Sequence, residues 1–113
     1  MKELPKSTKV VVIGGGVAGT SCAYHLAKFG WKDVVLLERD QLTSGTTWHA
    51  AGLVGQLGAS STITKIRKYS LDLYKELEKT TGLSTGLKQN GAITVASTKE
   101  RMQELLRQAT TAQ

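Results

Sequence analysis

The sequence predicts an α/β fold that opens with a strand–helix–strand (βαβ) unit. Residues 9–13, Lys-Val-Val-Val-Ile, have the pattern of a strand buried on both faces, and they stop at three glycines. Apolar residues then recur at helical spacing over 17–29, and Gly30 can end that helix in the left-handed conformation. Residues 34–38 form a second strand of the buried type. This order predicts a parallel strand pair with a right-handed crossover, the start of a doubly wound sheet.

The rest of the chain predicts a long loop and then a helix, a strand and a helix. Residues 39–60 are rich in Gly, Ser and Thr without a period, which is typical of a functional loop or of disorder. A helix is expected from residue 61 until Gly82, followed by a strand at 91–96. The capping box Ser97-Thr-Lys-Glu100 predicts a final helix. We therefore divide the chain into an extension (1–8), the βαβ unit with its loop (9–60) and a helix–strand–helix segment (61–113).

Composition excludes several classes of protein. The 113 residues are 40% hydrophobic and 21% charged, as in a soluble globular chain. The single cysteine, Cys22, cannot form an internal disulfide, and we expect it to be buried in the first helix. No apolar run approaches the roughly 20 residues that span a membrane, and the first residues lack the apolar core of a secretory signal. The net charge of +6 forms no basic face with aromatics, so nucleic acid is not an expected partner.

The pattern G-x-G-x-x-G, formed by Gly14, Gly16 and Gly19, lies between the first strand and the first helix. In such a Rossmann-type unit the first glycine makes a tight turn, the second admits a pyrophosphate to the helix start, and the third allows close packing. Glu38 ends the second strand, where a carboxylate accepts ribose hydroxyls and disfavours NADP. This pattern predicts a bound dinucleotide and leaves FAD and NAD open. The expected contacts are Gly14, Gly16, Val17, Ala18, Gly19, Glu38 and Arg39.

Several segments resemble known flavoproteins. Three segments of the βαβ unit resemble the start of flavoprotein amine oxidoreductases of the D-amino-acid-oxidase type, namely residues 11–20, 23–28 and 32–39. The loop Leu-Thr-Ser-Gly-Thr-Thr-Trp-His-Ala-Ala-Gly-Leu (42–53) is more specific and resembles the dimethylglycine dehydrogenase and sarcosine dehydrogenase group. Residues 74–82 and 89–96 are similar to that group as well. The resemblance runs from about residue 9 and covers a small first part of the family's length. It implies an incomplete FAD-binding domain, an amino-terminal portion that we expect to have no turnover by itself.

The resemblance also implies roles for the residues of the loop. In that group the His of the Thr-Trp-His motif bonds covalently to the 8α carbon of the flavin, which implies this role for His49. The residues alone leave His49 as an ordinary loop histidine, and they leave Trp48 as either a ring neighbour or a core residue. No catalytic residue and no metal ligand is expected within the chain. Further flavin contacts are implied for Ser44, Gly45, Thr46, Thr47, Ala50, Gly52 and Leu53.

The reaction that the resemblance implies is oxidation of an N-methyl amino acid, such as sarcosine or dimethylglycine, by hydride transfer to FAD. Water takes up the one-carbon unit, or tetrahydrofolate does so in a separate C-terminal domain. Oxygen or an electron-transfer flavoprotein accepts the electrons. The implied compartment is the mitochondrial matrix or the bacterial cytoplasm. Two alternatives stay open, namely an NAD-binding dehydrogenase domain and a non-catalytic regulatory subunit similar to that of pyruvate dehydrogenase phosphatase.

Overall fold

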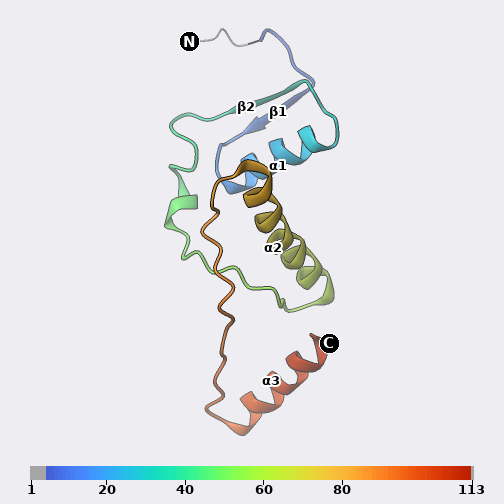
Figure 1. Cartoon of the computed structure of the whole chain (residues 1–113), viewed down its shortest axis with the longest axis vertical. Coiled ribbons are helices and arrows are strands. Elements are labelled where there is room, and N and C mark those ends of the chain that lie inside the picture. Colours follow the sequence, from blue (N-terminus) through green and yellow to red (C-terminus); the bar gives the residue numbers. More distant parts are fainter. Residues whose placement is uncertain (1–4, 113) are drawn as a thin grey trace. The chain divides into compact units, whose positions relative to one another are not determined.

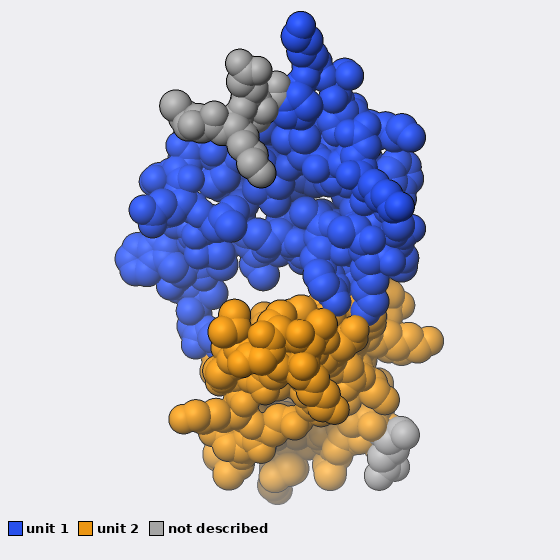
Figure 2. Space-filling model, turned by 45° about the horizontal axis from the view of Figure 1, so that its top comes forward, with its two compact units in different colours: residues 1–52 blue, residues 53–113 orange. Residues whose placement is uncertain are grey.

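The computed structural model describes residues 5–112 and divides the chain into two compact units, Met1–Gly52 and Leu53–Gln113 (Figure 2). In the first unit, β1 (Val10–Ile13) pairs in parallel with β2 (Val34–Leu37), and α1 (Val17–Lys28) connects them (Figure 1). The second unit contains α2 (Ser61–Thr81) and α3 (Lys99–Thr111). The predicted βαβ unit and both later helices are therefore confirmed. The boundary between the two compact units falls after Gly52, within the long loop between β2 and α2.

Helix α1 ends at the glycine that the sequence predicts. Gly30 has a φ of +89°, in the left-handed region. Its N–H donates to the carbonyl of Ala27 at 3.0 Å, and the N–H of Trp31 donates to the carbonyl of Leu26 at 3.0 Å. These two bonds satisfy carbonyls that the end of a helix otherwise leaves without partners. The chain can then reverse direction and enter β2.

Hydrogen bonds extend the pairing of β1 and β2 beyond both ends of the strands. At the amino end, the carboxylate of Asp33 accepts from the N–H of Lys9 at 3.1 Å and from the hydroxyl of Thr8 at 2.9 Å. At the carboxyl end, the N–H of Gly14 donates to the carbonyl of Leu37 at 2.8 Å. The glycine turn therefore starts in register with the end of β2.

Helix α2 carries the buried part of the second unit. Its first turn is capped by the Ser60 hydroxyl, which accepts from the N–H of Ile63 at 3.3 Å, and it ends at Gly82. Leu71 is 8% exposed and is the only buried hydrophobic side chain among the described residues. Thr85 follows the helix, and both its N–H and its hydroxyl donate to the carboxylate of Glu78, in the last turn of α2, at 2.8 Å. The chain after α2 is thus tied back to the last turn of the helix.

The expected strand at 91–96 is wrong, since the structure has no strand there. Ile93 and Val95 are 94% and 81% exposed. A strand is stable only when its N–H and C=O groups pair with a neighbour. Among the described residues the one sheet contains β1 and β2 alone, so this segment pairs with no strand. Its β-branched residues favour a strand, but strand propensity alone does not form one without a paired neighbour.

Two smaller expectations are also corrected. The cap of α3 is Thr98 and not Ser97, because the Thr98 hydroxyl accepts from the N–H of Arg101 at 3.1 Å. The helix therefore starts one residue later than the pattern Ser97-Thr-Lys-Glu100 suggests. Cys22 is exposed and not buried, because its face of α1 is not covered within the described chain. No described helix combines the length and the apolar character that a membrane crossing requires.

Helix α3 contains the ion pair with the clearest pH dependence. The carboxylate of Glu104 accepts from Nε and Nη2 of Arg107, each at 2.8 Å, and from Nε2 of Gln108 at 2.9 Å. These bonds, that of Arg107 first, lower the pKa of Glu104 from 4.5 to about 2. A lowered pKa means that the pair stabilises the helix above pH 4.5 and that this contribution is lost as pH falls through about 2.

We therefore expect the carboxyl carbon of Glu104 to titrate near pH 2 in a carbon-13 NMR experiment. In Arg107→Gln the midpoint should rise toward 4.5, because the bidentate bond is lost. High salt should shift the wild-type midpoint in the same direction, since the pair is exposed to solvent. A wild-type midpoint near 4.5 would contradict this expectation.

Candidate functional site

The glycine turn lies at the carboxyl end of the two parallel strands. Gly14 has a φ of +99°, a conformation that side chains rarely adopt. A Cβ added at Gly19 would overlap the backbone carbonyl oxygen of Gly14. The tight turn and the close approach of helix to strand that the sequence predicts at these two positions are therefore present in the structure.

The start of α1 is occupied by a side chain from the loop after β2. Gly16 is the N-cap residue of α1 and has no side chain with which to cap it. The hydroxyl of Thr47 takes this place and accepts from the N–H of Val17 at 2.9 Å. A Cβ at Gly16 would come within 3.0 Å of that hydroxyl oxygen. The glycine at this position thus allows Thr47 to reach a helix start that also suits a phosphate.

The carboxylate of Glu38 is bound to the glycine turn. Its Oε2 accepts from the N–H of Gly15 at 2.6 Å, and its Oε1 accepts from the N–H groups of Arg39 and Asp40 at 2.7 and 3.1 Å. The bonds from Gly15 and then Asp40 hold the pKa of the Glu38 carboxyl below its ordinary 4.5, so the group stays ionised. A carboxylate has about four acceptor sites, which leaves roughly one for a ribose hydroxyl.

Gly15 is the residue at this turn that the sequence reasoning missed. It is buried, and a Cβ there would lie 2.5 Å from Cδ2 of Leu42 and 3.1 Å from the Glu38 side chain. Its carbonyl also accepts from the N–H of Thr43 at 3.0 Å. The three consecutive glycines at 14–16 were the available signal, because the fingerprint requires only the first and the third of them.

The loop after Glu38 folds into a short 3-10 helix, η1 (Thr46–His49), that ends at the predicted flavin-linking residue. Nδ1 of His49 lies 3.2 Å from the carbonyl oxygen of Gly45. The His49 ring lies against that of Trp48, with centroids 3.8 Å apart and planes tilted by 34°, and Nε1 of Trp48 donates to the carbonyl of Ser44 at 3.0 Å. Trp48 is 67% exposed and is therefore not a core residue of this unit.

The geometry at His49 selects one tautomer of the neutral ring. A carbonyl oxygen only accepts hydrogen bonds, so Nδ1 carries the proton that faces Gly45. The lone pair then lies on Nε2, the nitrogen on the other side of the ring. His49 is exposed, so that lone pair is open to a partner.

The other predicted contact residues divide between the two units. Val17 and Ala18 lie in the first turn of α1, Ser44 and Gly45 lie in the exposed turn that leads into η1, and Thr46 is the first residue of η1. Ala50 and Gly52 are exposed at the end of the first unit. Leu53 opens the second unit and is 91% exposed. The structure thus gathers the glycine turn, Glu38 and Thr47, whereas Leu53 belongs to a separate unit.

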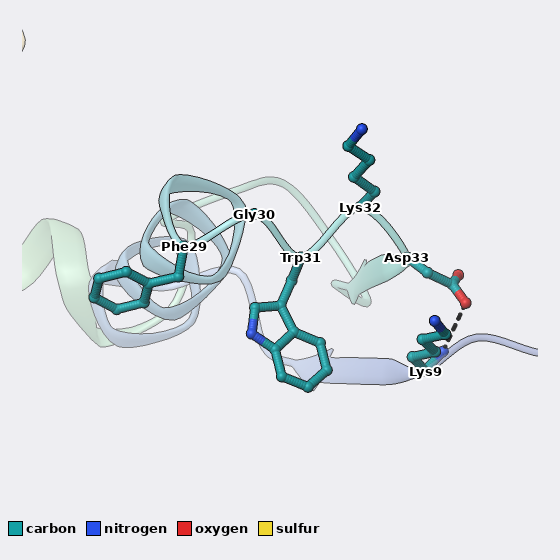
Figure 3. Close-up of a pocket in the computed structure, with 6 residues that line it drawn as sticks. All are labelled: Lys9, Phe29, Gly30, Trp31, Lys32 and Asp33. Carbon is teal, nitrogen blue, oxygen red and sulfur yellow. Dashed lines mark hydrogen bonds between the residues drawn. The ribbon is translucent and has the colours of Figure 1, made fainter.

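A hollow of about 320 Å³ lies at the opposite end of the strands from the glycine turn (Figure 3). Its position is set by the turn between α1 and β2 and by the amino end of β1. Ligands of open parallel sheets bind at the carboxyl ends of the strands, so this hollow is not the dinucleotide site. It is lined by Lys9, Phe29, Gly30, Trp31, Lys32 and Asp33.

A glycine turn, a helix that starts directly after it and an ionised acid at the end of the second strand together define a dinucleotide-binding βαβ unit. Residues 9–113 match the family described as FAD dependent oxidoreductase (DAO). The chain belongs to this family. The match favours FAD over NAD as the dinucleotide, and the features at Gly14, Gly19 and Glu38 fit the ADP part of FAD.

Similar proteins include two oxidoreductases and one regulatory protein. Dimethylglycine dehydrogenase of Rattus norvegicus, named as mitochondrial, is 49% identical over 96% of this chain and 13% of its own length. The 4-methylaminobutanoate oxidase (formaldehyde-forming) of Paenarthrobacter nicotinovorans is 48% identical over 91% of this chain and 12% of its own length. The mitochondrial pyruvate dehydrogenase phosphatase regulatory subunit of Mus musculus is 45% identical over 92% of this chain and 12% of its own length.

These comparisons confirm the resemblance on which the sequence analysis relied. The chain spans 12–13% of the length of these relatives, so they bear on its fold and cofactor more directly than on a complete activity. The mitochondrial matrix and the bacterial cytoplasm both remain predictions for the compartment.

Proposed function

We propose that this chain is the FAD-binding and flavin-linking portion of an oxidoreductase that oxidises N-methyl amino acids. The observation that carries the proposal is the docking of η1 onto the glycine turn through Thr47 and Val17. Through this contact His49, the residue proposed to link the flavin, is held on the same unit as the residues proposed to bind the ADP part of FAD.

The residues of the turn have distinct roles in this proposal. The remaining acceptor site of Glu38 binds a hydroxyl of the adenosine ribose. In the first turn of α1 the Val17 N–H is bound by Thr47, and the N–H of Ala18 beside it faces the pyrophosphate. The turn Ser44–Thr47 lies beside the phosphate and ribityl part of the cofactor, and its lack of large side chains allows close approach.

His49 acts as the nucleophile that tethers the cofactor. The carbonyl of Gly45 holds the proton on Nδ1, and the adjacent ring of Trp48 restricts rotation of the imidazole. Nε2 then presents its lone pair for bond formation. Bound FAD would supply the electrophilic 8α carbon for this bond and would take up the two electrons released with loss of a proton from that carbon, with dissolved oxygen as the final oxidant.

The substrate class follows from the relatives and not from a pocket. Two of the relatives are named for dimethylglycine and 4-methylaminobutanoate, and both names describe N-methylated amines that carry a carboxylate. We infer a substrate of this class, with sarcosine and dimethylglycine as the first to test. Oxygen or an electron-transfer flavoprotein then accepts the electrons.

A non-catalytic regulatory role is the second candidate, because the regulatory subunit relative is 45% identical to this chain. The test is anaerobic addition of dimethylglycine or sarcosine to the full-length, FAD-loaded protein. We expect the visible absorbance of the flavin to bleach, and glycine, which lacks the N-methyl group, to cause no change. Bleaching by neither N-methyl amine nor by 4-methylaminobutanoate would contradict the enzymatic proposal and favour the regulatory role.

A further inference from the structure

The loop that carries His49 is attached to the glycine turn at two points. The N–H of Thr43 donates to the carbonyl of Gly15 at 3.0 Å, and the Thr47 hydroxyl accepts from the N–H of Val17 at 2.9 Å. Thr43 has a φ of +67°, which a threonine adopts only when surrounding contacts enforce it. These attachments join a loop and a turn that are far apart in the sequence, 30 residues in the case of Val17 and Thr47.

The second attachment lies within the 3-10 helix and close to the nucleophile. Thr47 is the second residue of η1, and His49 is the last. One turn of such a helix contains about three residues, so the two side chains share a rigid element. The contact of Nδ1 with Gly45 fixes the ring relative to this element, and the Thr47 bond fixes the element relative to α1.

We propose that Thr47 is a positioning residue for the covalent attachment of flavin at His49. The inference rests on the proposed function. The Thr47 hydroxyl caps α1, which Gly16 cannot cap, and thereby sets the distance between the helix start that receives the pyrophosphate and the imidazole that receives the flavin ring. Attachment requires both ends of one cofactor to be in place together, so loss of this bond slows attachment more than it weakens FAD binding.

The test uses the full-length protein, prepared without flavin from cells limited in riboflavin. Thr47→Val removes the hydroxyl with little change in volume, and Thr47→Ser keeps the hydroxyl. Thr64→Val is the matched control, because the Thr64 hydroxyl also accepts a backbone N–H, that of Gly58 at 3.0 Å, in the second unit. The rate of attachment is followed as flavin fluorescence that survives acid denaturation. FAD affinity is measured separately with each variant combined with His49→Ala.

We expect Thr47→Val to attach flavin about tenfold or more slowly than wild type, with FAD affinity changed by less than about threefold. Thr47→Ser and Thr64→Val should attach flavin at close to the wild-type rate. Equal rates in Thr47→Val and wild type would overturn the inference. A loss of affinity that matches the loss of rate would also overturn it, since Thr47 would then be only a cofactor contact.

Two further outcomes distinguish a failure of this inference from a failure of the proposed function on which it rests. A wild-type protein that binds FAD without any covalent attachment overturns both the linking role of His49 and the inference. Attachment in wild type with an equal defect in Thr47→Val and Thr47→Ser overturns the inference alone. Thermal melts accompany each variant, and Thr47→Ala replaces Thr47→Val if the latter does not fold.

Discussion

His49→Ala should yield a full-length protein that still binds FAD but releases all of it on acid denaturation. The variant removes the imidazole whose Nε2 lone pair the Gly45 carbonyl leaves available. It leaves the glycine turn, Glu38 and the Thr47 cap of α1 in place. The measurement is flavin fluorescence on a denaturing gel after acid precipitation, for protein expressed with excess riboflavin.

The control for this experiment is His25→Ala, which removes the other of the two histidines in the chain. His25 lies on α1 with Nδ1 2.7 Å from the carbonyl oxygen of Ser21, within its own helix. Its replacement should leave the fluorescent band unchanged. A fluorescent band that persists in His49→Ala would place the covalent link at another residue and refute the assignment.

Gly19→Ala should abolish FAD binding and destabilise the first unit. The added Cβ would overlap the backbone carbonyl oxygen of Gly14, and neither atom can rotate away as the end of a flexible side chain can. Relief requires α1 to move away from β1, which displaces the helix start that we propose to face the pyrophosphate. Overpacking of this kind costs on the order of 1–3 kcal/mol or more in free energy of unfolding. The measurements are FAD retention during gel filtration and denaturant unfolding.

The matched control is Gly55→Ala. A Cβ at Gly55 would meet nothing within 4 Å, and its φ is not in the left-handed region, so the same methyl group is added without a clash. This variant should retain FAD and unfold at the wild-type denaturant concentration. Retention of FAD by Gly19→Ala at wild-type affinity would show that the close approach of α1 to β1 is not needed for cofactor binding.

The elements that depend on neighbouring residues were predictable. The end of α1 at Gly30 depends on one glycine and on bonds to Ala27 and Leu26, which lie within five residues along the chain. The end of α2 at Gly82 and the apolar pattern of β1 have the same local origin. A strand also needs a partner edge, which explains why the β-branched residues at 91–96 misled the prediction.

The candidate site also contains features that neighbouring residues determine and features that depend on distant ones. The glycine fingerprint and Glu38 could be identified because their spacing follows from one βαβ unit. The flavin-linking role proposed for His49 came from a resemblance, since a histidine in a loop of small residues has no local signal of its own. The bonds of Gly15 to Glu38 and to Thr43 were not predictable from spacing.

The sequence by itself determined the order of β1, α1 and β2, the position of the glycine turn and the family to which the chain belongs. Only the tertiary structure decided which groups meet at that turn. The Thr47 hydroxyl reaches Val17 across 30 residues, and the Glu38 carboxylate reaches Gly15 across 23. Such contacts depend on the path of the backbone through space, whereas helix ends, caps and strand patterns depend on a few adjacent residues and their hydrogen bonds.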